Sequence, residues 1–147
     1  MQLVQHLGRA LKSDELLDLI ELQDLKIQYH VDTLHENTPD SYSARSEDLA
    51  FELLFNENQI LTTVFHYISP EENIDTQAAR IGVPLYLTLD EARQAAVAMG
   101  VPFAMRENVE IPELGLMVCW AKLTVQGHTR HYQFSAKGLD QLTLSLR

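Results

Sequence analysis

The chain has few of the residues that identify an enzyme. It contains one cysteine in 147 residues, so an internal disulfide is impossible. Cys119 lies in the apolar run 116–120, with no neighbouring base or cation to favour its thiolate. Phosphate-binding loops and the G-x-G-x-x-G, G-x-S-x-G and H-E-x-x-H motifs are absent. We therefore expect a protein that is not an enzyme and that uses no cofactor.

Basic residues are also scarce, with 11 Lys and Arg against 21 Asp and Glu. Phosphate contacts require clustered cations, so we expect no nucleic-acid partner. No apolar run has the length of a membrane span, and the first residues lack the pattern of a signal peptide, so we expect a cytoplasmic protein without membrane contact. The six histidines are scattered. His30 and His35, with Asp32 and Glu36, are the nearest approach to a mixed ligand set, and we expect no metal site.

The acidic residues are unevenly distributed. Residues 1–73 hold four basic and fourteen acidic residues, whereas residues 74–147 hold seven of each. The whole net charge of −10 therefore belongs to the first half. Such an asymmetry affects partners and association rates rather than the fold, and it favours a cationic macromolecule as partner.

Length and composition predict a single compact domain, residues 1–147, because 46% of the residues are hydrophobic. Leu11-Lys12-Ser13-Asp14-Glu15 aligns with Leu87-Thr88-Leu89-Asp90-Glu91, and each segment precedes a helix-like stretch and then a strand, a turn and a strand. We therefore expect an α+β fold of two similar units, each a helix packed on an antiparallel sheet. The units cover about 1–68 and 74–147, with a polar linker at 69–73. A chance likeness of two α+β segments is the alternative.

Two helices are expected. In the first, Ser13 is a natural N-cap, and one apolar arc contains Leu16, Leu19, Ile20, Gln23 and Ile27. The second begins after the capping residue Thr88 and ends at Gly100.

Strands are expected where apolar residues alternate. The rows that should face inward are Leu49, Phe51, Leu53 and Phe55; Met117, Cys119, Ala121, Leu123 and Val125; and Leu142, Leu144 and Leu146. Trp120 faces away from its row, with Lys122 and Thr124. It is either an interface anchor or a side chain covered by a helix or by the other unit.

The candidate partner-binding residues are acidic. Asp14, Asp18 and Glu21 share the outer face of the first helix. The passage 34–48 is expected to be a loop that carries further carboxylates and an exposed tyrosine. The complete expected set is Asp14, Asp18, Glu21, Glu36, Asp40, Tyr42, Glu47 and Asp48. The alternative is that these residues only form a solvated helix face and a solubilising loop.

The second unit reads as a capped helix, Gly100-Val101-Pro102, a strand with Trp120, Tyr132-x-Phe134, a Lys137-Gly138 turn and a leucine-rich strand. This layout resembles the α+β repeat of outer-membrane lipoproteins of the SmpA/OmlA type, and its doubled form resembles the beta-lactamase inhibitor protein family. It also resembles small cytoplasmic immunity proteins that neutralise secreted bacterial toxins. The resemblance implies binding of a cognate toxin domain, which the acidic half predicts to be cationic. The alternative is an acidic secretion chaperone or adaptor for an effector protein. Neither pattern predicts the oligomeric state.

Overall fold

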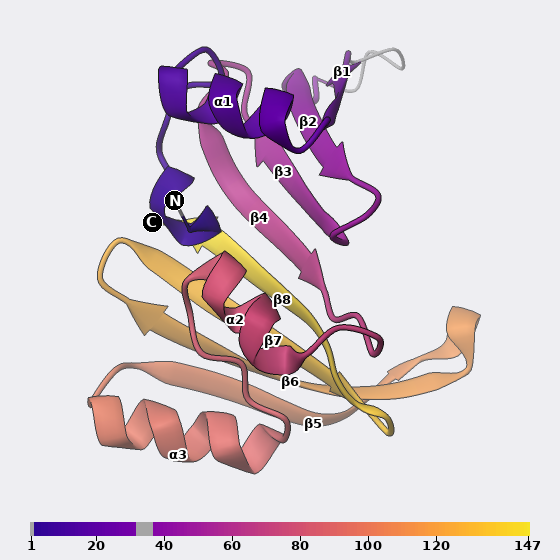
Figure 1. The fold of residues 1–147 in the computed structure, drawn as a ribbon. Coiled ribbons are helices and arrows are strands. Elements are labelled where there is room, and N and C mark those ends of the chain that lie inside the picture. The colour runs from indigo at the N-terminus through magenta and orange to yellow at the C-terminus, as the bar shows by residue number, and fades with distance from the viewer. Residues whose placement is uncertain (1, 32–36) are drawn as a thin grey trace.

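The computed structural model describes residues 2–31 and 37–147, and within them the chain forms an eight-stranded antiparallel sheet with helices packed against it (Figure 1). The elements in chain order are η1 (Leu3–His6), α1 (Asp14–Leu22), β1 (Lys26–His30), β2 (Ser41–Ser46), β3 (Phe51–Phe55), β4 (Leu61–Tyr67), α2 (Ile74–Ile81), α3 (Leu89–Met99), β5 (Phe103–Ile111), η2 (Pro112–Leu114), β6 (Leu116–Val125), β7 (His128–Ser135) and β8 (Gly138–Leu146). The expected α+β class with an antiparallel sheet is confirmed.

The sheet consists of two meanders that meet in its middle. Its strand order is β1-β2-β3-β4-β8-β7-β6-β5, so each run of four consecutive strands is contiguous, and β4 pairs with β8. Helix α1 precedes the first run, and α2 and α3 lie between the two runs. None of the helices in the described ranges has the length and apolar character needed to cross a bilayer.

Only one face of the sheet is buried. Phe51, Leu53 and Phe55 of β3 are fully buried, as are Leu142 and Leu144 of β8, and all five join one core with residues of the helices. The helices contribute Leu16, Ile81, Ala92 and Ala96 to this core. Most alternate strand positions are half-buried or exposed, and Ser43 and Val118 are buried exceptions.

The ends predicted for the two expected helices agree with the structure to different degrees. Helix α3 follows the prediction, since the Thr88 hydroxyl accepts from the Glu91 amide and Gly100 ends the helix in the left-handed region. Helix α1 begins after Ser13 as expected, but the Ser13 hydroxyl makes no capping bond. The extension of the apolar arc to Ile27 is wrong. The chain turns at Asp24, whose φ is 50°, and Ile27 lies in β1.

Two strand predictions also need correction. The passage expected to be a loop contains β2, whose central residue Ala44 is fully buried between β1 and β3. The inward row of β6 holds for Ala121, Leu123 and Val125, but Met117 is 52% exposed. Beyond the core, β5 and β6 continue as a two-stranded ribbon (Figure 1), so the inner face of that ribbon has nothing to bury against.

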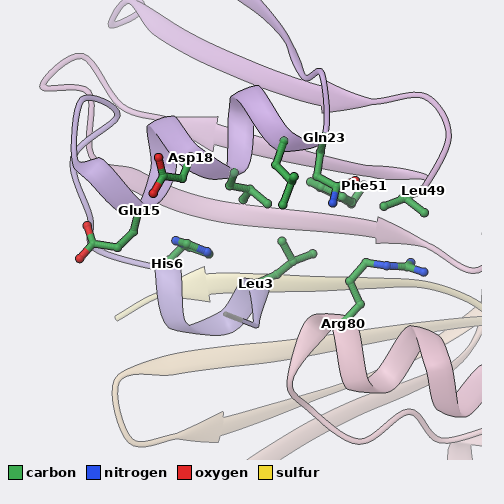
Figure 2. Close-up of a pocket in the computed structure, with 10 residues that line it drawn as sticks. Leu3, His6, Glu15, Asp18, Gln23, Leu49, Phe51 and Arg80 are labelled. Atoms are coloured by element: carbon green, nitrogen blue, oxygen red, sulfur yellow. The ribbon is translucent and has the colours of Figure 1, made fainter.

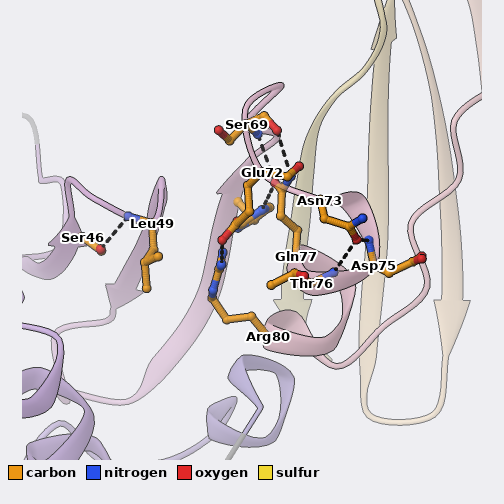
Figure 3. Close-up of polar contacts among 10 residues, drawn as sticks. Ser46, Leu49, Ser69, Glu72, Asn73, Asp75, Thr76, Gln77 and Arg80 are labelled. Carbon is orange, nitrogen blue, oxygen red and sulfur yellow. Dashed lines mark hydrogen bonds and ion pairs between the residues drawn. The ribbon is translucent and has the colours of Figure 1, made fainter.

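A buried glutamine joins the end of β4 to α2 (Figure 3). The Gln77 side-chain oxygen accepts from His66 Nε2 at 3.0 Å and from the Ser69 amide at 3.0 Å. Its amide nitrogen donates to the carbonyls of Ser69 and Glu72, both at 2.9 Å. All four hydrogen-bonding positions of the side-chain amide are thus occupied, and the whole residue has 0% exposure.

The N-terminal turn η1 is held against the end of α2. The Gln2 side-chain amide donates to the Ala79 carbonyl, and Gly82 follows α2 with a φ of 91°. A Cβ atom at Gly82 would lie 2.7 Å from Gln2 Cβ and 2.8 Å from Val4 Cγ1. Glycine is required there both for the left-handed backbone and for the close approach of η1.

Replacing Gln77 with leucine is expected to destabilise the protein by about 3 kcal/mol. The substitution preserves volume but leaves the His66 N–H, the Ser69 amide and two carbonyls without partners. Urea unfolding of Gln77→Leu measures the loss. The control is Gln94→Leu on exposed α3, where only a surface bond to Asp90 is lost, and it should change stability by less than about 0.5 kcal/mol. Equal midpoints for Gln77→Leu and wild type would contradict this account.

Stability is expected to fall with acid, in part through His66. Its Nε2 must carry the proton, because the Gln77 oxygen can only accept, and Nδ1 is buried without a partner among the described residues. Burial lowers the pKa of His66, so the unfolded chain takes up a proton near pH 6.5 that the folded chain resists. The contribution is therefore complete above pH 6.5 and decreases as the pH falls toward the folded pKa.

The measurement is the free energy of unfolding of wild type and His66→Gln between pH 7.5 and 5. The variant should show a slope shallower by up to about 1.4 kcal/mol per pH unit, the value for one proton. Part of the slope will remain, because burial also lowers the pKa of His6, His128 and His131. Identical slopes would exclude His66 as a source of the acid sensitivity.

Candidate functional site

A half-open groove of about 420 Å³ lies between α1 on one side and η1 and α2 on the other (Figure 2). Apolar residues form much of its lining: Leu3, Leu19, Leu22, Leu49 and Phe51. Leu3 and Phe51 belong to the buried core, whereas Leu22 is 80% exposed at the rim. The groove therefore has an apolar interior that opens to solvent along α1.

The charged residues of the groove lie at different places along it. Figure 2 shows Glu15 and Asp18 of α1 on the side of His6, and Arg80 of α2 on the far side of Leu3. Glu15 forms an ion pair with Arg9 at 2.8 Å, and its pKa is lowered by a hydrogen bond from its own backbone amide and by the Arg9 guanidinium. Arg80 is paired with Glu72. Each end of the groove thus has an ion pair, and Asp18 is the charged residue of the lining that has no partner of opposite charge among the described residues.

His6 closes the acidic end from below. Its ring is 2% exposed and rises from η1 toward α1 (Figure 2), and its Nδ1 has no hydrogen-bond partner in the described part of the chain. Burial lowers the pKa of His6, and the nearby Arg9 lowers it further. The imidazole is consequently neutral at pH 7 and offers one unprotonated ring nitrogen as an acceptor.

The outer carboxylates of α1 are where the sequence predicts them. Asp14, Asp18 and Glu21 are exposed, and none of them forms an ion pair within the described residues. Asp14 favours the positive start of the helix, but Glu21 lies in the last turn, where a carboxylate opposes the helix dipole. Asp18 also repels both neighbours at i−4 and i+3. Asp18 and Glu21, which lie beyond the first turn, therefore lower the stability of α1.

Two further predicted residues lie near the C-terminal end of α1. Glu47 and Asp48 occupy the turn between β2 and β3 and line a hollow of about 220 Å³ together with Gln23, Asp24 and Lys26. Lys26 approaches Glu47 at 3.7 Å, with both side chains mostly exposed, so this pair contributes little to stability. Arg45 lines the same hollow, so two cations lie among its carboxylates.

Asp40 and Tyr42 belong to a different cluster. Tyr42 is not on an exposed loop as expected; it lies in β2, is half-buried against the core and stacks on Tyr29 with ring centroids 4.8 Å apart. The Tyr29 hydroxyl donates to the Asp40 carboxylate. This bond is the main cause that raises the pKa of Tyr29 to about 12. Glu36 lies outside the described residues.

Trp120 faces the uncovered side of the sheet, as the sequence predicts. The ring is half-buried and stacks on His131 at 5.2 Å between centroids, and Arg106 and Gln133 are its cross-strand neighbours. No helix of the described chain covers it. The alternative of a Trp120 buried under a helix is therefore wrong.

Groups typical of metal or thiol chemistry are not assembled in the described residues. No three His, Cys, Asp or Glu side chains there form a ligand cluster, and His35, Asp32 and Glu36 lie outside the described ranges. Burial, aided by the Glu107 carboxylate, raises the pKa of Cys119, which disfavours its thiolate at neutral pH.

No family model, curated protein or solved structure matches this chain. The site is therefore defined by its own geometry.

The groove is the feature that the sequence did not predict. Its lining comes from η1, α1, β3, α2 and the turn before β3, which are far apart in the chain. The inward arc of α1 identified Leu19 as apolar, but nothing local indicated that His6 and Arg80 would lie across from it.

Replacing Asp40 with asparagine is expected to lower the pKa of Tyr29 from about 12 toward its ordinary value of about 10, because the neutral amide accepts a weaker hydrogen bond from the hydroxyl than the carboxylate does and carries no charge. Tyrosine Cζ chemical shifts followed by NMR between pH 9 and 12 measure this. Asp48→Asn removes the same charge elsewhere and should leave Tyr29 unchanged. A Tyr29 titration that does not differ between the two variants would refute the assignment.

Proposed function

We propose that this protein is a cytoplasmic immunity protein that binds a cationic toxin domain and neutralises it without catalysis. The observation that carries the proposal is the set of exposed, unpaired carboxylates on α1, next to a groove with an apolar interior. The carboxylates beyond the first turn of α1 lower the stability of the helix and form no ion pair with a described residue. Charges of this kind fit a role in binding a partner.

Such a surface suits a toxin that acts on nucleic acid. Carboxylates can occupy the positions where the toxin binds phosphate, and the negative field of the first half speeds encounter with a basic surface. The expected contact surface comprises Asp14, Asp18 and Glu21 on α1 with Glu47 and Asp48 in the neighbouring turn. Asp40, Tyr42 and Glu36 complete the expected contact set, although Tyr42 packs against the core and Glu36 lies outside the described residues.

The partner is to be recovered by capture with the tagged protein from its own host, washed at low and then at high salt. The recovered protein is then expressed alone and together with this chain. The proposal expects a basic protein that stops growth when expressed alone, a 1:1 complex, and growth restored by co-expression. A partner that is harmless to the host, or toxicity that co-expression leaves unchanged, would count against immunity.

Reversing three charges, Asp14→Lys, Asp18→Lys and Glu21→Lys, is expected to slow association with that partner about tenfold or more at low ionic strength, with a smaller effect at high salt. The control reverses Glu107, Glu110 and Glu113, three exposed carboxylates of the β5–β6 ribbon and η2, and changes the net charge equally. Stopped-flow mixing measures both rates. Equal slowing in the two variants would mean that net charge acts, not the α1 surface.

A secretion chaperone or adaptor is the second candidate, and β1 favours it. This strand is the edge of the sheet and is exposed at all five positions, and Ile27, Tyr29 and the following Val31 are each 51–54% exposed. An exposed edge with apolar side chains can accept an extended segment of another chain. A chaperone would then hold its effector unfolded along β1.

Hydrogen exchange on the recovered complex separates the two candidates. Immunity predicts a folded partner and new protection on α1 and the β2–β3 turn. A chaperone predicts a partner segment that is unfolded apart from its contact and new protection of β1 amides.

We also propose that the chain derives from two similar units. The support is the shared order of helical segments followed by four consecutive antiparallel strands, with the last strand of each run, β4 and β8, paired in the middle of the sheet. Separate expression of residues 74–147 would show whether the second unit folds alone.

A further inference from the structure

The groove under α1 is suited to a narrower class of ligand than a general acidic surface. It combines an apolar interior, two carboxylates at one end and a buried histidine beside them with an unpartnered nitrogen. We propose that this groove receives one lysine or arginine side chain of the partner protein, with the aliphatic stem inside and the cationic head between α1 and His6. This inference rests on the proposed function and names the anchor by which the partner is held.

The stem of such a side chain matches the interior. Lysine and arginine carry three or four methylene groups before the charge, and these favour apolar surroundings while the head remains polar. Leu3 and Phe51 form the buried part of the lining, and Leu19 flanks them from α1. A short anionic ligand or a fully polar ligand would place no apolar group against this surface.

The acceptors at this end outnumber its one cation, Arg9, which is already paired with Glu15. Asp18 makes no ion pair with any described residue, and Glu15 shares its charge with Arg9 alone. The neutral ring of His6 offers a nitrogen lone pair to an arriving N–H group, and its position under α1 places that ring on the same side as the two carboxylates (Figure 2). A cation would pair with Asp18, the carboxylate of the lining that has no cation among the described residues, whereas an anion would be repelled by it.

Arg80 fixes the direction of insertion. It lies at the other end of the lining, and its Nη1 is buried with no partner among the described residues. Its charge is compensated there by Glu72, so no free carboxylate of the lining attracts a cation to that end, and a backbone carbonyl of the inserted segment would accept from Nη1. The inserted side chain therefore points its head toward His6 and its backbone toward Arg80.

The first test uses the protein without its partner. The probes are Nα-acetyl-arginine amide and its uncharged isostere Nα-acetyl-citrulline amide, and the readout is NMR of the His6 ring and the Leu3 and Leu19 methyl groups. The arginine probe should cause saturable shifts with a dissociation constant in the millimolar range expected of a fragment. The citrulline probe should bind at least about tenfold more weakly, since it lacks the charge. Equal shifts from both probes, or shifts confined to the Glu47–Asp48 turn, would overturn the inference.

The second test blocks the groove without altering its charge. Leu22→Trp enlarges a rim residue, and Leu17→Trp is the matched control, because Leu17 is 45% exposed on α1 but does not line the groove. The inference expects Leu22→Trp to weaken binding of both the arginine probe and the recovered partner about tenfold or more, with Leu17→Trp close to wild type. Equal binding by the two variants would refute it.

The two tests also separate this inference from the proposed function. Saturable probe binding with no toxin recovered from the host would reject immunity and leave the groove as a cation-tipped side-chain site. A neutralised toxin whose binding is unaffected by Leu22→Trp would retain immunity and reject the groove as the anchor.

Discussion

The buried amide of Gln77 is the constraint on which the position of α2 against the first strand run depends. It bonds to the end of β4 through His66, to the connecting segment through Ser69 and Glu72, and it belongs to α2. A side-chain amide with all four positions occupied has one arrangement of low energy, because any shift leaves a buried polar group unsatisfied. The start of α2 is therefore fixed relative to β4, and the Glu72–Arg80 ion pair lies beside the same network (Figure 3).

The groove follows from this constraint. One wall is α1, which packs on the first strands through Leu16, and the opposite wall is η1 and α2. Residue Gly82 lets η1 approach α2 closely, and Gln2 bonds to the α2 backbone, so His6 and Arg80 keep their places together. Of the two parts of the opposite wall, α2 lies far from α1 in sequence, and the Gln77 network joins α2 to the end of β4.

The features that the sequence predicts correctly are those determined by residues close together in the chain. The ends of α3 follow from Thr88 and Gly100, and the buried row of β3 follows from alternating phenylalanine and leucine. The sequence of β2, Ser-Tyr-Ser-Ala-Arg-Ser, has little apolar alternation and therefore predicts a loop. Its place in the sheet comes from pairing with β1 and β3 on both sides. Likewise Asp18 was recognised as an exposed acid, but its neighbour across the groove, His6, was not, since only tertiary packing brings them together.

The position of each acidic residue on α1 determines whether it affects the association rate or the dissociation rate. Asp14 and Glu21, exposed at the two ends of α1, act on a cationic partner over distances comparable to the Debye length, so their effect belongs to the association rate and is screened by salt. Asp18 and Glu15 border a groove with an apolar interior, where a cation loses part of its water and salt screens less. Their effect would persist in the dissociation rate at high salt. One helix can thus both attract and hold a partner, because Glu15 and Asp18 border the apolar groove and Asp14 and Glu21 do not.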